Sequence, residues 1–263
     1  MGESPLDRCS PDGRRGKVHP MPKDFFDEPI ASGYDADSAL MFDPGIVDPA
    51  VAFLADLAGD GDALEFGIGT GRIALPLSRR GVPVHGVDLS EAMVGRLRAK
   101  PGGEALAVTI GDFATTQVGE TFGVVYLVYN GISNLTTQDE QVECFRNAAS
   151  HLEPGGCFVI EVLVPALRRL PPGETFRPFT VTSTHLGFDE YDTVTQAAVS
   201  HHYSIDHGSV GAWSIPWRYV WPSELDLMAR LSGMTLRERW GWWRREPFTA
   251  ESASHISVWE KAN

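Results

Sequence analysis

One short stretch of the sequence combines the residue types of a ligand-binding turn. Residues 63–77 read ALEFGIGTGRIALPL, in which an apolar run carries the acid Glu65 and is followed by Gly67, Gly69 and Gly71. Glycine lacks a Cβ and tolerates positive φ, so a backbone built from it can come close to a ligand. A helical pattern opens directly after the last glycine. The stretch predicts a strand, a tight loop and a helix around a bound small molecule.

The spacing of these glycines distinguishes between ligands. A dinucleotide fingerprint, G-x-G-x-x-G, needs a small residue where the helix packs on the strand, and Arg72 stands at that place. Glu65 would also bring a negative charge beside a pyrophosphate, whereas it suits a ligand with a positive end, such as the amino group of a methionine moiety. The spacing disfavours an NAD-dependent oxidoreductase and leaves a generic glycine-rich turn as the plain alternative.

Two further acids follow apolar runs later in the chain. Asp88 comes after residues 82–87, and Asp112 with its neighbour Phe113 comes after residues 105–110. In doubly wound folds ligands bind where the carboxyl ends of parallel strands meet, and an acid after the second strand can accept from both ribose hydroxyls. A solvated helix cap is the alternative for Asp88, and a simple turn is the alternative for Asp112.

Hydrophobic patterning predicts the elements that hold these residues. Apolar runs predict strands at 82–87, 105–110, 122–129 and 157–163 after the first one, and the nearly all-apolar run at 122–129 is typical of a central parallel strand buried on both faces. Cap signals indicate helices that begin at Pro49, behind Asp48, and that span 91–100 and 138–151. Pro154–Gly156 is expected to turn the chain into the fifth strand.

The second half of the chain changes pattern. Alternating side chains over residues 175–221 predict an antiparallel meander added to the sheet, with a tight turn at Asp206–Gly208. Ser223 is expected to cap a helix over 224–231, and residues 235–243 and 255–261 to form a closing hairpin. The expected fold is α/β, a doubly wound Rossmann-like sheet of seven strands with a closing antiparallel hairpin and an inserted antiparallel meander.

The expected organisation has four parts. They are a disordered N-terminal tail (1–23), a cofactor-binding core (24–164), an antiparallel insertion that roofs the substrate (165–221), and a C-terminal helix with the closing hairpin (222–263).

Composition narrows the function. The formal net charge of −13 argues against nucleic acid as a partner, because phosphate binding needs clustered Lys and Arg. The apolar runs are too short to span a bilayer, and the N-terminus lacks the apolar segment of a signal peptide. Three cysteines without metal-ligand spacing predict neither a metal site nor a disulfide framework. A cytoplasmic protein is expected, and its oligomeric state stays open, with a homodimer as one option.

In the order of its motifs the chain resembles class I S-adenosylmethionine-dependent methyltransferases, over about residues 25–165 and 222–261. The resemblance rests on Glu65–Gly71, Asp88-Leu89-Ser90, Gly111-Asp112, the run that ends at Tyr129, and Pro154–Gly156 before the fifth strand. The nearest subgroup looks like the small-molecule methyltransferases of actinobacterial secondary metabolism, such as deoxyaminosugar N,N-dimethyltransferases. The insertion does not match those sugar enzymes closely enough to carry a substrate across.

The resemblance implies a set of cofactor-binding residues. The three glycines would approach the methionine part of S-adenosyl-L-methionine, Glu65 would orient its amino group, and Asp88 would bind the ribose. Asp112 and Phe113 would lie along the adenine, and Tyr34 would close over the sulfonium side. Leu89 and Tyr129 complete the set of residues expected around the cofactor.

Methyl transfer from a sulfonium is an in-line displacement, so the protein mainly aligns the acceptor and the methyl group in a dry pocket. A general base is needed only if the acceptor must lose a proton. His201 and Tyr129 are the expected catalytic residues, with His185 and His202 behind them. A structural histidine within a strand is the plain alternative for His201.

The expected function is therefore transfer of a methyl group to nitrogen or oxygen of a small molecule. A non-catalytic module that has kept the cofactor site is the alternative from another class. Turnover to S-adenosylhomocysteine with amines, phenols or sugars separates the two.

Overall fold

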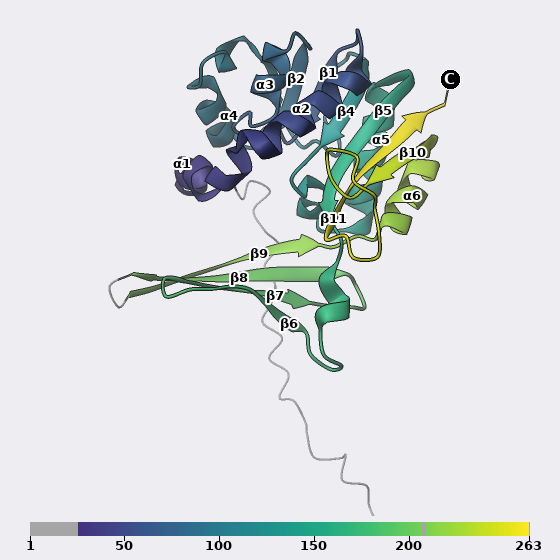
Figure 1. Cartoon of the computed structure of the whole chain (residues 1–263). Helices are drawn as coiled ribbons and strands as arrows, with labels where there is room; N and C mark the ends of the chain where they lie inside the picture. Colours follow the sequence, from purple (N-terminus) through teal and green to yellow (C-terminus); the bar gives the residue numbers. More distant parts are fainter. Residues whose placement is uncertain (1–25, 207–208, 263) are drawn as a thin grey trace, which may run out of the picture.

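The structure is a computed structural model that describes residues 26–206 and 209–262. It contains two sheets, a large one wrapped by helices and a smaller one that lies apart from it, below it in the view of Figure 1. The predicted tail over 1–23 and the turn residues His207 and Gly208 lie outside the described residues.

The large sheet has seven strands in the order β10-β11-β5-β4-β1-β2-β3. Five of them pair in parallel and form the Rossmann-like core, and β11 pairs antiparallel with both β5 and β10. The predicted doubly wound fold with its closing hairpin is confirmed. The strands are β1 (Ala63–Phe66), β2 (Val84–Asp88), β3 (Ala107–Ile110), β4 (Phe122–Leu127), β5 (Leu152–Leu163), β10 (Met234–Trp240) and β11 (Ser254–Lys261).

Helices flank this sheet. They are α1 (Glu28–Asp37), α2 (Pro44–Ala58), α3 (Ala74–Arg79), α4 (Glu91–Arg98), α5 (Gln138–His151) and α6 (Pro222–Leu231), with 3₁₀ turns η1 (Ala39–Phe42), η2 (Gly103–Ala105), η3 (Gly131–Asn134) and η4 (Ala166–Arg169). α5 has the predicted bounds, and its capping box between Thr137 and Glu140 is formed on both sides.

Two predicted helix starts are wrong. α2 begins at Pro44 because the Asp43 carboxylate accepts from the Gly45 amide at 2.7 Å, and Pro49 lies inside the helix. α6 begins at Pro222 behind Trp221, so Ser223 is a helical residue and not the cap. In both cases a proline in the first turn marks the start, since its missing N–H costs nothing there.

The bounds of two predicted strands also change. β4 stops at Leu127, and Tyr129 and Asn130 after it have φ of 54° and 60°, which lie in the left-handed region. β5 begins at Leu152, so Pro154–Gly156 belongs to the strand and does not form the turn expected there.

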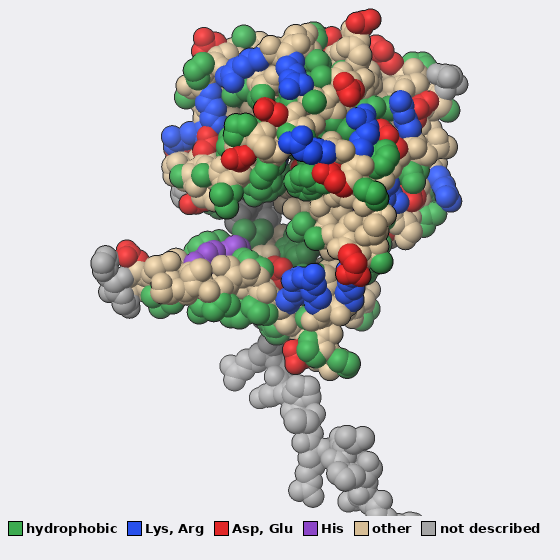
Figure 2. Space-filling model, in the orientation of Figure 1, with side chains coloured by type: hydrophobic (Ala, Val, Ile, Leu, Met, Phe, Trp, Pro, Cys, Tyr) green, Lys and Arg blue, Asp and Glu red, His purple; other side chains and the backbone are tan. Residues whose placement is uncertain are grey.

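The predicted meander forms a sheet of its own and is not added to the large one. Its strands pair antiparallel in the order β6 (Phe176–Val181), β7 (His185–Tyr191), β8 (Ala197–Asp206) and β9 (Ser209–Arg218). Figure 2 shows histidine side chains on the side of this sheet that is turned toward the large sheet.

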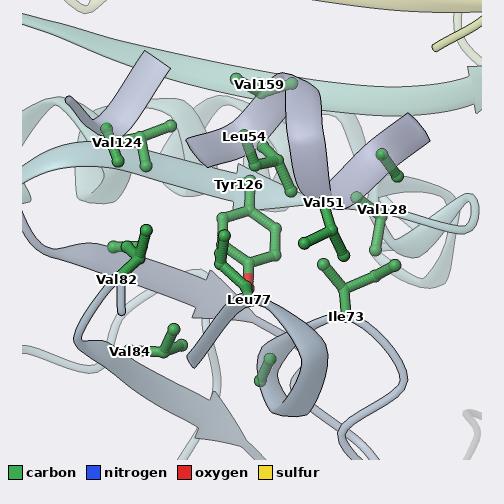
Figure 3. Packing of buried hydrophobic residues seen from close by; sticks show 14 of the residues in the cluster. Val51, Leu54, Ile73, Leu77, Val82, Val84, Val124, Tyr126, Val128 and Val159 are labelled. Carbon is green, nitrogen blue, oxygen red and sulfur yellow. The ribbon is translucent and has the colours of Figure 1, made fainter. Parts of the chain in front are cut away.

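The core under the parallel strands is continuous and closely packed. The Tyr126 ring from β4 lies among aliphatic side chains of α2 and of the segment after the glycine-rich loop, including Val51, Leu54 and Leu77 (Figure 3). These side chains are almost fully buried. A second cluster fills the opposite face under α5 and α6. Tight packing on both faces fixes the strand ends, where the loops of the site begin.

Candidate active site

The glycine-rich loop between β1 and α3 has the backbone that its sequence predicts. Gly67, Gly69 and Gly71 have φ of 66°, 53° and 80°. A Cβ on Gly71 would lie 2.3 Å from Leu97 Cδ1, so packing against α4 also excludes a larger residue there. At Gly67 the nearest atom to an added Cβ is Leu127 Cδ1 at 3.9 Å, so nothing crowds that part of the loop.

Asp88, the last residue of β2, is bonded to this loop. One carboxylate oxygen accepts from the Gly69 amide at 2.6 Å and the other accepts from the Ser90 amide at 2.8 Å. Ser90 in turn caps α4 by accepting from the Met93 amide at 3.2 Å. Half-buried Leu89 stands between them. The carboxylate therefore sits at the junction of the loop, β2 and α4.

Glu65 is a buried acid in the middle of β1, with 2% of its surface exposed. Its Oε2 accepts from the Tyr126 hydroxyl at 2.9 Å. Burial raises the pKa of Glu65 to about 8, and the Tyr126 hydrogen bond and the nearby Arg72 guanidinium oppose this rise only in part. With a pKa of about 8 the carboxyl group is mostly neutral at pH 7.

α1 docks on the same loop through Asp35. Its carboxylate accepts from the Thr70 hydroxyl at 2.6 Å and pairs with the Lys100 ammonium at 2.5 Å. Lys100 also donates to the Thr70 carbonyl at 2.8 Å. The preceding residue, Tyr34, has a pKa raised to about 12, first by burial and then by Tyr129 and the neighbouring acids. The predicted residue Tyr34 thus lies near Tyr129 at the edge of the loop.

Arg72 lies beside Tyr129, although the sequence pattern does not predict a place for it in the expected site. Its guanidinium carbon lies 5.1 Å from the centroid of the Tyr129 ring. Its charge also acts on Glu65 and Glu161, both of which are buried. The available sequence signal was the basic Arg72 directly after the glycines, together with the acidic Glu65 before them.

Asp112 and Phe113 follow β3, next to the end of β2. The Gly111 amide donates to the Asp88 carbonyl at 2.8 Å, which joins the two strand ends. Asp112 Oδ1 accepts from the Ala114 amide at 2.9 Å, and the Phe113 ring stacks on Phe66 with centroids 5.9 Å apart. The structure therefore brings Asp112 and Phe113 to the edge that also carries Asp88 and the glycines.

His201 lies elsewhere, on β8 of the small sheet. Its ring nitrogens contact Glu190 Oε2 at 3.1 Å and Ser214 Oγ at 2.9 Å. His201 lines a cavity of about 510 Å³. The residues described as lining that cavity all come from β6, β7 and β8: Phe176, Leu186, Phe188, Glu190, His201 and Tyr203. These residues include none of the expected cofactor-binding residues.

His185 and His202 point to the opposite face of the small sheet from His201. Their rings are hydrogen-bonded, with His185 Nε2 and His202 Nδ1 3.1 Å apart, and Trp213 stacks on His202 at 5.0 Å between centroids. Burial, and then His185, lower the pKa of His202. This face therefore carries an aromatic patch of His185, His202 and Trp213. Two other tryptophans, Trp243 and Trp259, are buried in the core.

Residues 63–156 match the model of a methyltransferase domain. Cypemycin N-terminal methyltransferase from a Streptomyces species is 29% identical over 245 residues, which make up 90% of this chain and 97% of that protein. The structure of the CcbJ methyltransferase from Streptomyces caelestis is 38% identical, has a TM-score of 0.74, and covers 82% of this chain and 89% of its own. The chain belongs to the S-adenosylmethionine-dependent methyltransferases.

The fold extends to more distant members. The structure of CalS10, an amino pentose methyltransferase from Micromonospora echinaspora with S-adenosylmethionine bound, has a TM-score of 0.65 at 20% identity and covers 87% of this methyltransferase and 96% of its own chain. These relatives are enzymes, which favours catalysis over the non-catalytic module. In residues 26–206 and 209–262 of this methyltransferase, no helix has the length and apolar character that crossing a membrane requires.

Proposed function

We propose that this methyltransferase moves the methyl group of S-adenosyl-L-methionine to a nitrogen or oxygen atom of a small molecule by in-line displacement. The bound cofactor supplies an activated methyl carbon, and the protein aligns the acceptor with it. One observation carries the proposal: the Asp88 carboxylate, the glycine-rich loop and the buried Glu65 meet at one edge of the sheet. The relatives that share this fold are methyltransferases.

The donor set fits the amino-acid end of this cofactor. Glu65 would face the amino group, since an ammonium would stabilise the buried carboxylate, which Arg72 does only in part. The Arg72 guanidinium, held beside Tyr129, would pair with the carboxylate. The space beside Gly67 is free of close neighbours, the nearest atom to an added Cβ being 3.9 Å away, so the loop backbone can approach this part of the ligand.

The nucleoside end fits the neighbouring strand ends. Asp88 would accept from the ribose hydroxyls, with Leu89 beside it. Asp112 would accept from the exocyclic amine of the adenine, and Phe113 would cover the ring. Tyr34 would close over the sulfonium side, because α1 docks on the loop through the next residue, Asp35.

Nitrogen is the favoured acceptor atom. Cypemycin N-terminal methyltransferase is named for an N-terminus and CalS10 for an amino pentose, and both of these substrates carry an amine. The net charge of −13 also suits an acceptor that arrives as an ammonium ion, which must release a proton to solvent before its nitrogen attacks the methyl carbon. Of the two predicted catalytic residues, Tyr129 is the one that lies beside Arg72 and Tyr34, so we assign the contact with the acceptor to Tyr129.

Two measurements test the proposal. Isothermal titration of the purified protein should show binding of S-adenosylmethionine and S-adenosylhomocysteine, and no binding of either would refute it. Formation of S-adenosylhomocysteine should then be measured with sugar amines, peptide N-termini, phenols and sugar hydroxyls. Turnover with amines is expected; binding without any turnover would support the non-catalytic module instead.

A further inference from the structure

Two successive residues without glycine's freedom adopt the left-handed conformation at the end of β4. Tyr129 and Asn130 have φ of 54° and 60°, in the left-handed region of backbone conformations that glycine most often adopts. Such strain persists only where surrounding contacts impose it, and it concentrates at functional sites. The contacts that impose this conformation therefore reveal which residue controls Tyr129.

Three hydrogen bonds hold this backbone to the end of β5. The Tyr129 amide donates to Glu161 Oε2 at 2.9 Å, and the Asn130 amide donates to the Glu161 carbonyl at 3.1 Å. The Asn130 side chain then accepts from the Leu163 amide at 2.7 Å. Glu161 contributes both its carboxylate and its backbone, so it is the central residue of this clamp.

Glu161 is a buried acid inside an apolar strand, with 6% of its surface exposed. Burying a carboxylate is costly unless hydrogen bonds and opposite charge compensate. The compensation comes from the Tyr129 amide, the Arg72 guanidinium and the Trp243 indole. An apolar residue would pack in the strand without this cost. The hydrogen bond to the Tyr129 amide therefore explains why an acid stands here.

The clamp ends at the proposed cofactor site. The Tyr129 ring, 38% exposed, faces the Arg72 guanidinium at 5.1 Å, and both side chains lie near Tyr34. A change of φ at residue 129 would swing the ring away from Arg72. Small displacements of positioning groups have large effects on binding and transfer.

We propose that Glu161 is a positioning residue, whose carboxylate holds Tyr129 in the left-handed conformation and thereby fixes the Tyr129 ring and the Arg72 guanidinium against the amino-acid end of the cofactor. The inference rests on the proposed function. It predicts that Glu161 acts on one end of the ligand and not on the whole site.

The test compares two ligands of the full-length protein by isothermal titration. S-adenosylhomocysteine has the amino-acid end, and 5′-methylthioadenosine lacks it. Glu161→Ala should weaken S-adenosylhomocysteine binding about tenfold and leave 5′-methylthioadenosine within about twofold. An equal loss for both ligands, or no loss for either, would overturn the proposal. If the unaltered protein binds neither ligand, the proposed function fails, and not the role of Glu161.

Controls separate positioning from stability. Val162→Ala, at the next buried residue of β5, should destabilise the core and leave both affinities unchanged. Tyr129→Ala, on an exposed ring, should reproduce the selective loss even if Glu161→Ala folds poorly. The double variant should bind S-adenosylhomocysteine no more weakly than Tyr129→Ala alone, whereas multiplied losses would show that Glu161 does not act through Tyr129.

Discussion

The Asp88 carboxylate accepts a hydrogen bond from the Gly69 amide at 2.6 Å, and so joins the end of β2 to the loop after β1. The same carboxylate accepts from the Ser90 amide at the start of α4. One side chain therefore shapes the glycine-rich loop and is also the acid proposed to bind the ribose.

Asp88→Ala should weaken S-adenosylhomocysteine binding roughly 10- to 100-fold, because it removes a charged acceptor from both the loop and the ligand. Asp88→Asn keeps one acceptor oxygen and should lose less. Isothermal titration measures both, with Glu91→Gln, an exposed acid at the start of α4, as the control. Unchanged affinity for S-adenosylhomocysteine in Asp88→Ala would show that Asp88 does not bind the cofactor.

Glu65 should make cofactor binding release a proton. The pKa of Glu65 is about 8 without ligand, so the group is mostly protonated at pH 6.5. A bound ammonium favours the charged form, and about one proton should leave on binding. Titration calorimetry in two buffers of different ionisation enthalpy measures the release. Glu65→Gln should abolish it, and equal release in that variant would place the proton elsewhere.

The same group should affect stability. Between pH 4.5 and about 8 the folded chain keeps a proton that the unfolded chain releases, so the free energy of unfolding falls as pH rises through this window. Glu65→Gln has no such dependence. Urea denaturation should show the variant gaining stability relative to the unaltered protein at pH 8.5 compared with pH 5. A difference that stays constant across this range would contradict the raised pKa.

His255 should make the protein sensitive to acid. Its ring is fully buried on β11, and burial, aided by Arg239, lowers its pKa to about 3. Below pH 6.5 the unfolded imidazole binds a proton that the folded one does not, so stability falls by up to about 1.4 kcal/mol per pH unit down to pH 3. His255→Leu should flatten this dependence in urea denaturation between pH 6 and 4. An unchanged slope in His255→Leu would contradict the lowered pKa.

His201→Ala should keep turnover within about twofold once an acceptor is known, because its cavity is lined by residues of the small sheet. His202→Ala, on the opposite face, is the matched comparison. A large loss of turnover for His201→Ala across pH, with cofactor affinity unchanged, would instead support the role as general base that the sequence suggested.

Much of the fold was predictable because its signals are local. Parallel strands show as apolar runs, and the ends of these runs predict that Glu65, Asp88 and Asp112 lie at one edge of the sheet. The start of α2 was missed for an equally local reason, since the Asp-Pro pair occurs twice, at 43–44 and 48–49. In the first pair the Asp43 carboxylate accepts from the Gly45 amide in the first turn of α2, and this bond marks the start of the helix.

The rest of the site depends on contacts between distant segments. Glu161 stands in an apolar run that looks like an ordinary buried strand, and the amide that it holds belongs to Tyr129 in the loop after β4. The contact of Arg72 with the Tyr129 ring likewise joins segments that are far apart in the sequence. The alternating side chains of residues 175–221 predict the hairpins of the small sheet. No local pattern indicates that these hairpins form a sheet separate from the large one.

The bonds of Asp35 to Thr70 and Lys100 have a consequence for the dynamics of the enzyme. Since α1 is anchored to the loop proposed to hold the cofactor, any ligand that orders the loop must also order the helix, and the coupling is reciprocal. Amide hydrogen exchange should therefore slow across Glu28–Asp37 when S-adenosylhomocysteine is added. In Asp35→Ala the protection should stop at the loop, which would uncouple the N-terminal helix from occupancy of the site.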